Sequence, residues 1–225
     1  MYIMSHLDIH SQRPAPAAAP HGPSNAFRAG KWPINCLTVA LLFVGWISAK
    51  AEEPTVRITT SLGSILVAVD AQHAPVSAAN FLRYVDLRMY DGGRFHRTVT
   101  LDNQPDKVAK IEVIQAGIDP RRQQEQFAPI ALERTSLTGL KHLAGVVSMA
   151  RDGPDTATSD FFICVTDQPS LDFGGARNPD GQGFGAFGRV VRGMEVVRRI
   201  QQAKAMGQTL TPPVKILSIR RLPKD

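Results

Sequence analysis

The chain has 225 residues, of which 43% are hydrophobic and 20% are charged. This composition is typical of a globular protein and not of a disordered one, and the length allows one domain of ordinary size with a buried core. The formal net charge is +6, but the basic residues are scattered apart from short pairs. The contiguous basic patch of a nucleic-acid-binding surface is missing, so no nucleic-acid partner is expected.

The first 51 residues are predicted to be a disordered leader followed by a signal peptide. Residues 1–26 are rich in Pro, Ala, His and Ser without hydrophobic periodicity. A basic flank then precedes the apolar stretch 36–48, which is shorter than a confident transmembrane helix. Ala49-Lys50-Ala51 supplies small residues two apart, so we expect cleavage after Ala51 and a periplasmic or secreted protein. The alternative is an uncleaved signal that anchors the protein in the membrane, facing the periplasm.

Cleavage would leave a mature domain of residues 52–225 with a different balance of charge and cysteine. Residues 1–51 hold four basic residues and one acidic residue, so the formal net charge falls from +6 to +3. Cys164 becomes the only cysteine, which excludes an intrachain disulfide, and we expect it to be a buried small hydrophobe. The three remaining histidines are too sparse for a metal site, so neither a metal nor a cofactor is predicted.

The first half of the mature domain is predicted to contain a hairpin, a helix and two further strands. The helix should begin at Pro75, a residue favoured in the first turn, and continue with apolar residues at helical spacing. In the strand that follows, simple alternation would point Phe95 and Arg97 one way and His96 the other. The expected strands are 56–60, 64–69, 94–99 and 111–116.

The second half contains two apolar strands, 146–149 and 161–165, separated by a stretch rich in Asp, Gly, Pro and Thr. This stretch is too long for a tight hairpin, so it should form an ordered surface loop, and such loops often carry function. Strands 187–191 and 214–219 and an amphipathic helix over 194–200 complete the domain. Many short strands with two helices predict an antiparallel β-barrel or sandwich.

Four motifs in this order resemble the cyclophilins, the cyclosporin-binding class of peptidyl-prolyl cis-trans isomerases. They are Phe95-His96-Arg97, Val113-Ile114-Gln115-Ala116-Gly117, residues 145–163 and Phe187-Gly188-Arg189-Val190. The resemblance covers about residues 55–222. It implies a mainly β fold, with a closed eight-stranded antiparallel barrel capped by two α-helices and a substrate groove on its outer face. It also implies a monomer that acts on proline-containing polypeptides.

The resemblance also assigns the site residues. Arg97 matches the catalytic arginine, and Gln115 matches the glutamine that binds the substrate backbone and positions that arginine. The residues expected to bind the substrate are Phe95 of the first motif, Val113, Phe162 and Leu171 around the proline ring, Ala150 and Arg151 beside the residue that precedes proline, and Phe184.

These residue types suit the reaction. Rotation about the X-Pro bond meets a barrier of about 18–20 kcal/mol, and at its top the proline nitrogen becomes pyramidal and more basic. A fixed donor that never deprotonates stabilises that nitrogen, and the guanidinium of Arg97 is such a donor. On sequence alone, Arg97 could instead form a surface salt bridge.

Several residues depart from the family pattern. Arg151 and Asp160 stand where the family usually has Asn and Gln, and Glu112 stands where a pocket phenylalanine is usual, which would thin one wall. Ser170 replaces a tryptophan that binds cyclosporin in many eukaryotic members, and the connection 100–110 is longer than usual. Two other hypotheses therefore stay open. The domain could be a non-catalytic module that binds proline-containing segments, or a scaffold tethered to the envelope through residues 1–51.

Overall fold

The computed structural model of the chain describes residues 53–223. The predicted leader, signal peptide and cleavage site after Ala51 lie outside the described residues. No helix within residues 53–223 is long and apolar enough to span a membrane.

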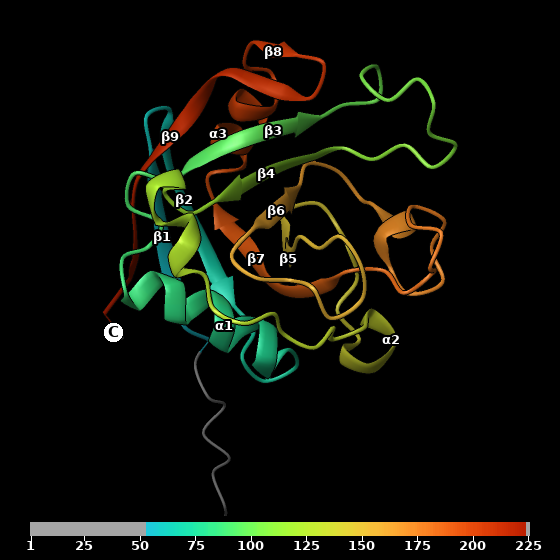
Figure 1. Ribbon diagram of the computed structural model, residues 1–225, viewed down its shortest axis with the longest axis horizontal. Helices are drawn as coiled ribbons and strands as arrows, with labels where there is room; N and C mark the ends of the chain where they lie inside the picture. The colour runs from blue at the N-terminus through green and yellow to red at the C-terminus, as the bar shows by residue number, and fades with distance from the viewer. Residues whose placement is uncertain (1–52, 224–225) are drawn as a thin grey trace, which may run out of the picture. The chain divides into compact units, whose positions relative to one another are not determined.

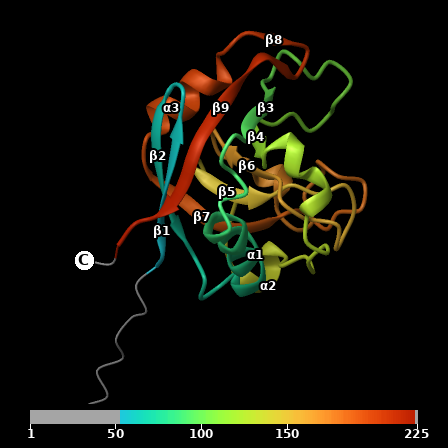
Figure 2. The same ribbon diagram turned by 60° about the vertical axis from the view of Figure 1, so that its left-hand side comes forward.

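Eight antiparallel strands close into a barrel (Figure 1). Their order around the barrel is β1-β2-β7-β5-β6-β4-β3-β9, and β9 pairs with β1 to close the ring. Figure 2 shows these two strands, from opposite ends of the domain, side by side. The eight-stranded barrel predicted from the resemblance is confirmed. The strands are β1 (Thr55–Thr60), β2 (Gly63–Val69), β3 (Arg94–Val99), β4 (Val113–Gly117), β5 (Val146–Met149), β6 (Phe161–Cys164), β7 (Gly185–Arg192) and β9 (Thr209–Arg221).

Two elements at the C-terminal end differ from the sequence prediction. The last strand, β9, begins five residues earlier than the predicted start at Val214, because Pro212 and Pro213 lie inside it and prolines interrupt a strand pattern. The two-residue strand β8 (Ala205–Met206) pairs only with β9 and lies outside the closed ring. A strand of that length has no readable alternation, so it was not predicted.

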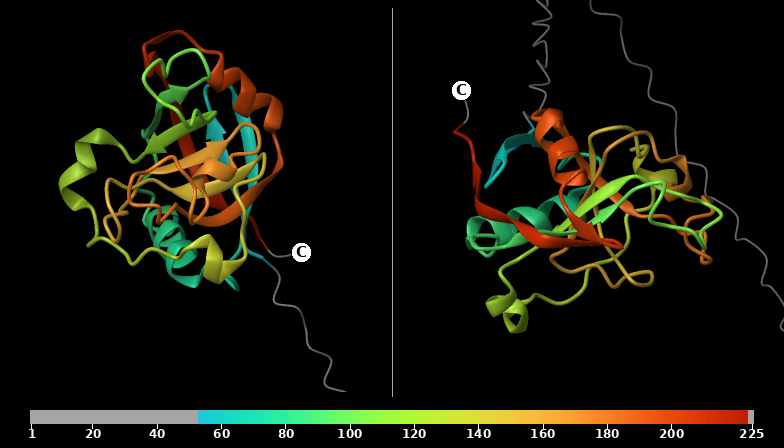
Figure 3. Two further views of the ribbon diagram at one scale, coloured as in Figure 1. Left: turned by 90° about the vertical axis from the view of Figure 1, so that its right-hand side faces the viewer. Right: turned by 90° about the horizontal axis from the view of Figure 1, so that it is seen from above.

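The two predicted helices lie at opposite ends of the barrel (Figures 1 and 3). They are α1 (Pro75–Asp86), which contacts β7 and β9, and α3 (Met194–Gln201), which contacts β2, β3 and β4. Three short helical elements were not predicted, since elements this short show no helical periodicity. These are η1 (Pro120–Glu125), α2 (Thr135–Thr138) and η2 (Pro169–Leu171).

Aromatic side chains fill the barrel beneath α1. Phe81 of α1 packs against Phe161 of β6 and Phe187 of β7, with ring centroids 5.4 and 5.0 Å apart. Phe161 also meets Tyr90 and Phe95 edge to face. All five side chains are fully buried. Phe161 of β6 therefore connects α1 with β3 through its ring contacts.

A β-bulge at His96 changes the alternation of β3. Phe95 pairs with Ala116 of β4, and Arg97 pairs with the adjacent Gln115, so His96 is an extra residue between them. The prediction that Phe95 and Arg97 share a face is wrong for this reason. Phe95 is fully buried in the barrel core, whereas Arg97 lies on the outer face beside Gln115.

We predict that Phe161→Ala lowers the free energy of unfolding by about 3–5 kcal/mol, because it removes a fully buried ring and leaves a cavity. Urea denaturation measures this loss. Leu217→Ala is the control, since Leu217 is 56% exposed on β9 and its loss should stay within about 0.5 kcal/mol. Equal losses in the two variants would contradict the packing described.

Candidate active site

A groove of about 540 Å³ runs over the outer face of β3, β4 and β6. The bulge places Arg97 and Val99 of β3 on this face, because they pair with Gln115 and Val113 of β4. Gln115 in turn pairs with Phe162 of β6. Nearly all the site residues expected from the sequence line this groove: Arg97, Val113, Gln115, Ala150, Arg151, Phe162, Leu171 and Phe184. Phe95 is the exception, because it lies in the barrel core.

The floor of the groove is an apolar cluster separate from the barrel core. It contains Val99, Ile111, Val113, Phe162, Cys164 and Leu171, with Ala150 and Phe184 packed against it. The rings of Phe162 and Phe184 meet edge to face at 5.3 Å. We call this set the apolar floor. The three residues expected around a proline ring are therefore together, and Phe184 forms their neighbouring wall.

Ile111, and not Glu112, faces the apolar floor. Glu112 accepts hydrogen bonds from Thr166 Oγ1 at 2.9 Å and Gln201 Nε2 at 3.2 Å, and it does not line the groove. Gln104, in the long connection before β4, exchanges two hydrogen bonds with the backbone of Ile111. The expected gap in the wall is filled because this connection fixes Ile111, which is only 5% exposed, in the floor.

Three buried polar residues support the floor from behind. His142 Nδ1 lies 2.8 Å from Asp172 Oδ1, and its Nε2 lies 3.1 Å from Ser148 Oγ. Burial acts to raise the pKa of Asp172, but its hydrogen bonds with His142 outweigh this and lower the pKa. The His142 ring stacks on Phe162 at 6.0 Å. Ser148 is fully buried, so this arrangement holds the floor and offers no accessible nucleophile.

Amide groups hold the guanidinium of Arg97. Its Nε and Nη2 donate to Gln208 Oε1 at 2.9 and 2.6 Å, and its Nη1 donates to Gln115 Oε1 at 3.0 Å. Burial lowers the pKa of Arg97, but an arginine remains a cation at neutral pH. No carboxylate within residues 53–223 forms an ion pair with it. Its charge is therefore fixed in place without being neutralised.

Gln115 connects Arg97 to Asp160, which also lines the groove. Its Nε2 donates to Asp160 Oδ2 at 3.2 Å, and His96 Nε2 lies 3.6 Å from the same oxygen. Gly117 permits Asp160 to lie here, because a Cβ atom at position 117 would clash with the Asp160 carboxylate. The two partners fix the orientation of the Gln115 amide, with its oxygen toward the guanidinium.

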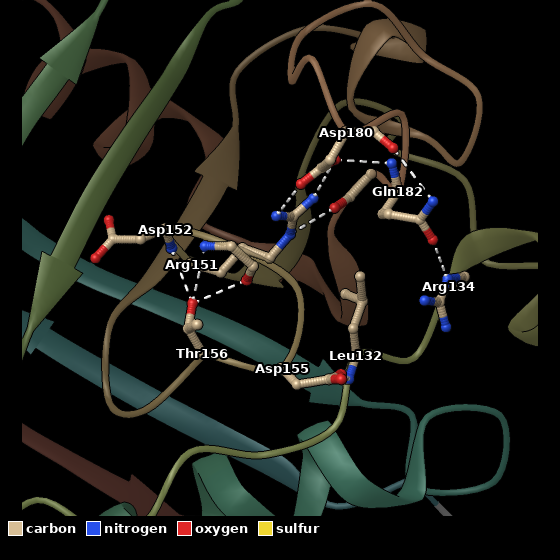
Figure 4. A network of polar contacts seen from close by, with 10 residues as sticks. Leu132, Arg134, Arg151, Asp152, Asp155, Thr156, Asp180 and Gln182 are labelled. Atoms are coloured by element: carbon tan, nitrogen blue, oxygen red, sulfur yellow. Dashed lines mark hydrogen bonds and ion pairs between the residues drawn. The ribbon is translucent and has the colours of Figure 1, made fainter.

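Arg151 holds a loop in place, as Figure 4 shows. Its Nη1 and Nη2 donate to the carboxylate of Asp180 at 2.7 and 3.0 Å, and its Nε donates to the Gly183 carbonyl at 2.8 Å. The guanidinium also lies 4.9 Å from the centroid of the Phe184 ring. Since the side chain is only 1% exposed, it fixes the wall of the groove and is not a free cation on its surface.

Cys164 lies in the apolar floor and is fully buried, which confirms its predicted place. Burial raises the pKa of its thiol far above the ordinary value. The thiol therefore stays protonated and unreactive.

Two residues that line the groove, Ile111 and Arg177, and one that holds Arg97 from outside the lining, Gln208, were not identified from the sequence. Ile111 was missed because the neighbouring Glu112 was matched to the pocket position of the family. Arg177 was missed because it lies in a Gly- and Asn-rich loop without a motif. Gln208 binds the catalytic candidate Arg97 from the turn between β8 and β9, 111 positions away. Only the family motifs gave a signal, and none of the three belongs to one.

Comparisons with known proteins bear on the family of the chain. Residues 55–221 match the family described as cyclophilin type peptidyl-prolyl cis-trans isomerase/CLD. A peptidyl-prolyl cis-trans isomerase A of Dickeya dadantii is 38% identical over 150 residues, which are 66% of this chain and 72% of that protein. A peptidyl-prolyl cis-trans isomerase of Acinetobacter baylyi is 35% identical over 181 residues, which are 77% of this chain and 89% of that protein.

The fold is also similar to a solved structure. A crystal structure of a Cryptosporidium parvum cyclophilin type peptidyl-prolyl cis-trans isomerase has a TM-score of 0.61 at 21% identity, covering 77% of this chain and 99% of that one. This likeness supports the fold, and the sequence matches support the family. The chain therefore belongs to the cyclophilin family and is a peptidyl-prolyl cis-trans isomerase.

Proposed function

We propose that this isomerase acts on unfolded or partly folded exported proteins, and that Arg97 stabilises the twisted X-Pro bond while the apolar floor holds the proline ring. The observation that carries the mechanism is the position of Arg97, a fixed guanidinium at the border of an apolar surface. Uncatalysed X-Pro rotation takes tens of seconds, so an isomerase would speed the folding of a protein chain after its export.

Arg97 keeps donors free for the substrate. A guanidinium has five N–H groups, and three hydrogen bonds to Gln115 and Gln208 are present. The remaining donors can reach a proline nitrogen whose lone pair becomes basic as the bond turns. Because the guanidinium is already oriented, no reorganisation is needed at the transition state.

The electrostatics of the groove favour this role. The partners of Arg97 are neutral amides, so its charge acts on the substrate at full strength. The apolar floor excludes water from one side of the bound ring, which strengthens a charged hydrogen bond. Glu112 and Arg151, which suggested a non-catalytic binding module, both have partners that keep them from blocking the floor.

We predict that Arg97→Ala lowers kcat/KM by about 10²–10³-fold, the usual effect of losing one preorganised donor. Arg97→Lys should restore part of the rate, because an ammonium cannot reproduce the planar fork. Neither change should alter the melting temperature strongly. A prolyl cis-trans assay and thermal unfolding measure the two quantities. Near-native catalysis by Arg97→Ala would refute the mechanism.

Phe162→Ala provides the contrast to these variants. It removes a ring that is 4% exposed and belongs to the apolar floor, so it should lower both the rate and the melting temperature.

We predict that Gln208→Ala lowers kcat/KM about tenfold, which corresponds to about 1.4 kcal/mol, near the lower end of what hydrogen bonds to a charged group contribute. Arg97 would lose its anchor at Nε and Nη2. The matched control is Gln202→Ala, because Gln202 is exposed and its side chain forms no hydrogen bond within the described residues. Equal rates for the two variants would show that Gln208 does not position Arg97.

The export proposal rests on the leader sequence and has its own test. N-terminal sequencing of the exported protein should begin at Glu52, after Ala49-Lys50-Ala51. Membrane-bound protein that still contains residues 32–48 would establish the anchored alternative, and uncut protein in the cytoplasm would contradict export.

A further inference from the structure

The groove contains positive charge that no carboxylate within residues 53–223 pairs with. Arg97, Lys107 and Arg177 all line the groove. None of the three forms an ion pair with any residue from 53 to 223. Arg151, the other arginine of the groove, is already paired with Asp180. Asp152 and Asp160 also line the groove, but neither forms an ion pair with Arg97, Lys107 or Arg177, so an anionic group on a ligand could pair with these cations.

Arg177 is held in position by the neighbouring loop. Its Nη1 donates to Gln104 Oε1 at 2.7 Å and to the Ala109 carbonyl at 2.9 Å. Gln104 is only 2% exposed and also donates to the carbonyls of Thr100 and Ile111. Two loops on the same side of the barrel meet here (Figures 1 and 3). The Nε and Nη2 atoms of Arg177 form no hydrogen bond in the described part of the chain, so they remain available.

The two guanidiniums also act on each other. Burial lowers the pKa of Arg177, and repulsion from Arg97 lowers it further. Like charges in one partly buried groove disfavour the charged state of each. An anion bound between or beside them would relieve this repulsion.

The charge is arranged along β4. Arg177 bonds to Ala109, two residues before Ile111, whereas Asp160 lies against Gly117 at the far end of the strand. Six residues of extended chain separate Ile111 from Gly117, which is about 20 Å. The apolar floor, which contains Ile111, therefore lies next to Arg177.

We propose that Arg177, together with Lys107, selects substrates that carry an aspartate or glutamate within about three residues of the proline. This inference rests on the proposed use of the groove and names its substrate class. Extended chain advances about 3.3 Å per residue, so side chains this close to a proline on the apolar floor reach the end of the groove. Lys107 belongs to the connection that is longer than in typical cyclophilins, so the selectivity would be a property of this chain.

The test uses pairs of proline peptides that differ only by glutamate or glutamine, placed in turn at each of three positions on either side of the proline. We expect at least one glutamate peptide to have a kcat/KM about three- to tenfold above its glutamine twin at low salt. Added salt should reduce this ratio, because the Debye length falls to about 8 Å at 0.15 M.

Two variants and one control locate the effect. Arg177→Gln should bring the glutamate-to-glutamine ratio close to one, whereas Arg177→Lys should retain most of it. Arg57→Gln removes the same charge from an exposed position on β1, three strands away from β4, and should leave the ratio unchanged. A ratio that survives Arg177→Gln would overturn the assignment to Arg177.

The design separates this inference from the proposed function. Catalysis with a ratio near one at every position would overturn the selectivity and leave the mechanism intact. Absence of catalysis on all peptides would contradict the mechanism. Calorimetric titration would then measure the dissociation constant of each glutamate peptide and of its glutamine twin, and the ratio of the two constants would test the selectivity. Equal dissociation constants at all positions would overturn it.

Discussion

The extra residue in β3 is the constraint on which the groove depends. Strict alternation would place Arg97 on the same face as Phe95, inside a barrel that aromatic rings already fill. The bulge at His96 moves Arg97 to the outer face, where it pairs with Gln115. It also brings Val99 opposite Val113, so the same shift supplies both the charged donor and part of the apolar floor. A charged residue and a core aromatic two positions apart can then serve different surfaces.

The walls of the groove depend on polar residues in loops. Gln104 binds the Ile111 backbone and Arg177, so one buried amide connects a pocket residue to a charged one. Arg151 connects the end of β5 to the loop before β7 through Asp180 and Gly183. Each of these side chains is nearly inaccessible. The barrel supplies the floor, and these amide and guanidinium contacts give the groove its fixed shape.

The sequence predicted the fold and most of the groove residues, because short motifs identify the family. The barrel and the meeting of Gln115, Phe162 and Leu171 in one groove followed from the family resemblance, which rests on four ordered motifs, and the two capping helices also followed from apolar residues at helical spacing. The bulge at His96 was not predictable, because it changes how β3 pairs with β4 and leaves no recognisable pattern in the sequence of β3. Gln208 and Arg177 were missed because their roles arise from contacts across 111 and 73 positions, and sequence periodicity reports only local structure.

The claim that Arg97 and the apolar floor act together on one X-Pro bond is tested most directly by a crystal structure with a bound Ala-Pro peptide. The account predicts that the proline ring lies on the floor formed by Ile111, Val113, Phe162 and Leu171. It also predicts a guanidinium nitrogen of Arg97 within hydrogen-bond distance of the X-Pro amide, while Arg97 keeps its contact with Gln208. A proline ring bound elsewhere, or an Arg97 turned away from the amide, would contradict it.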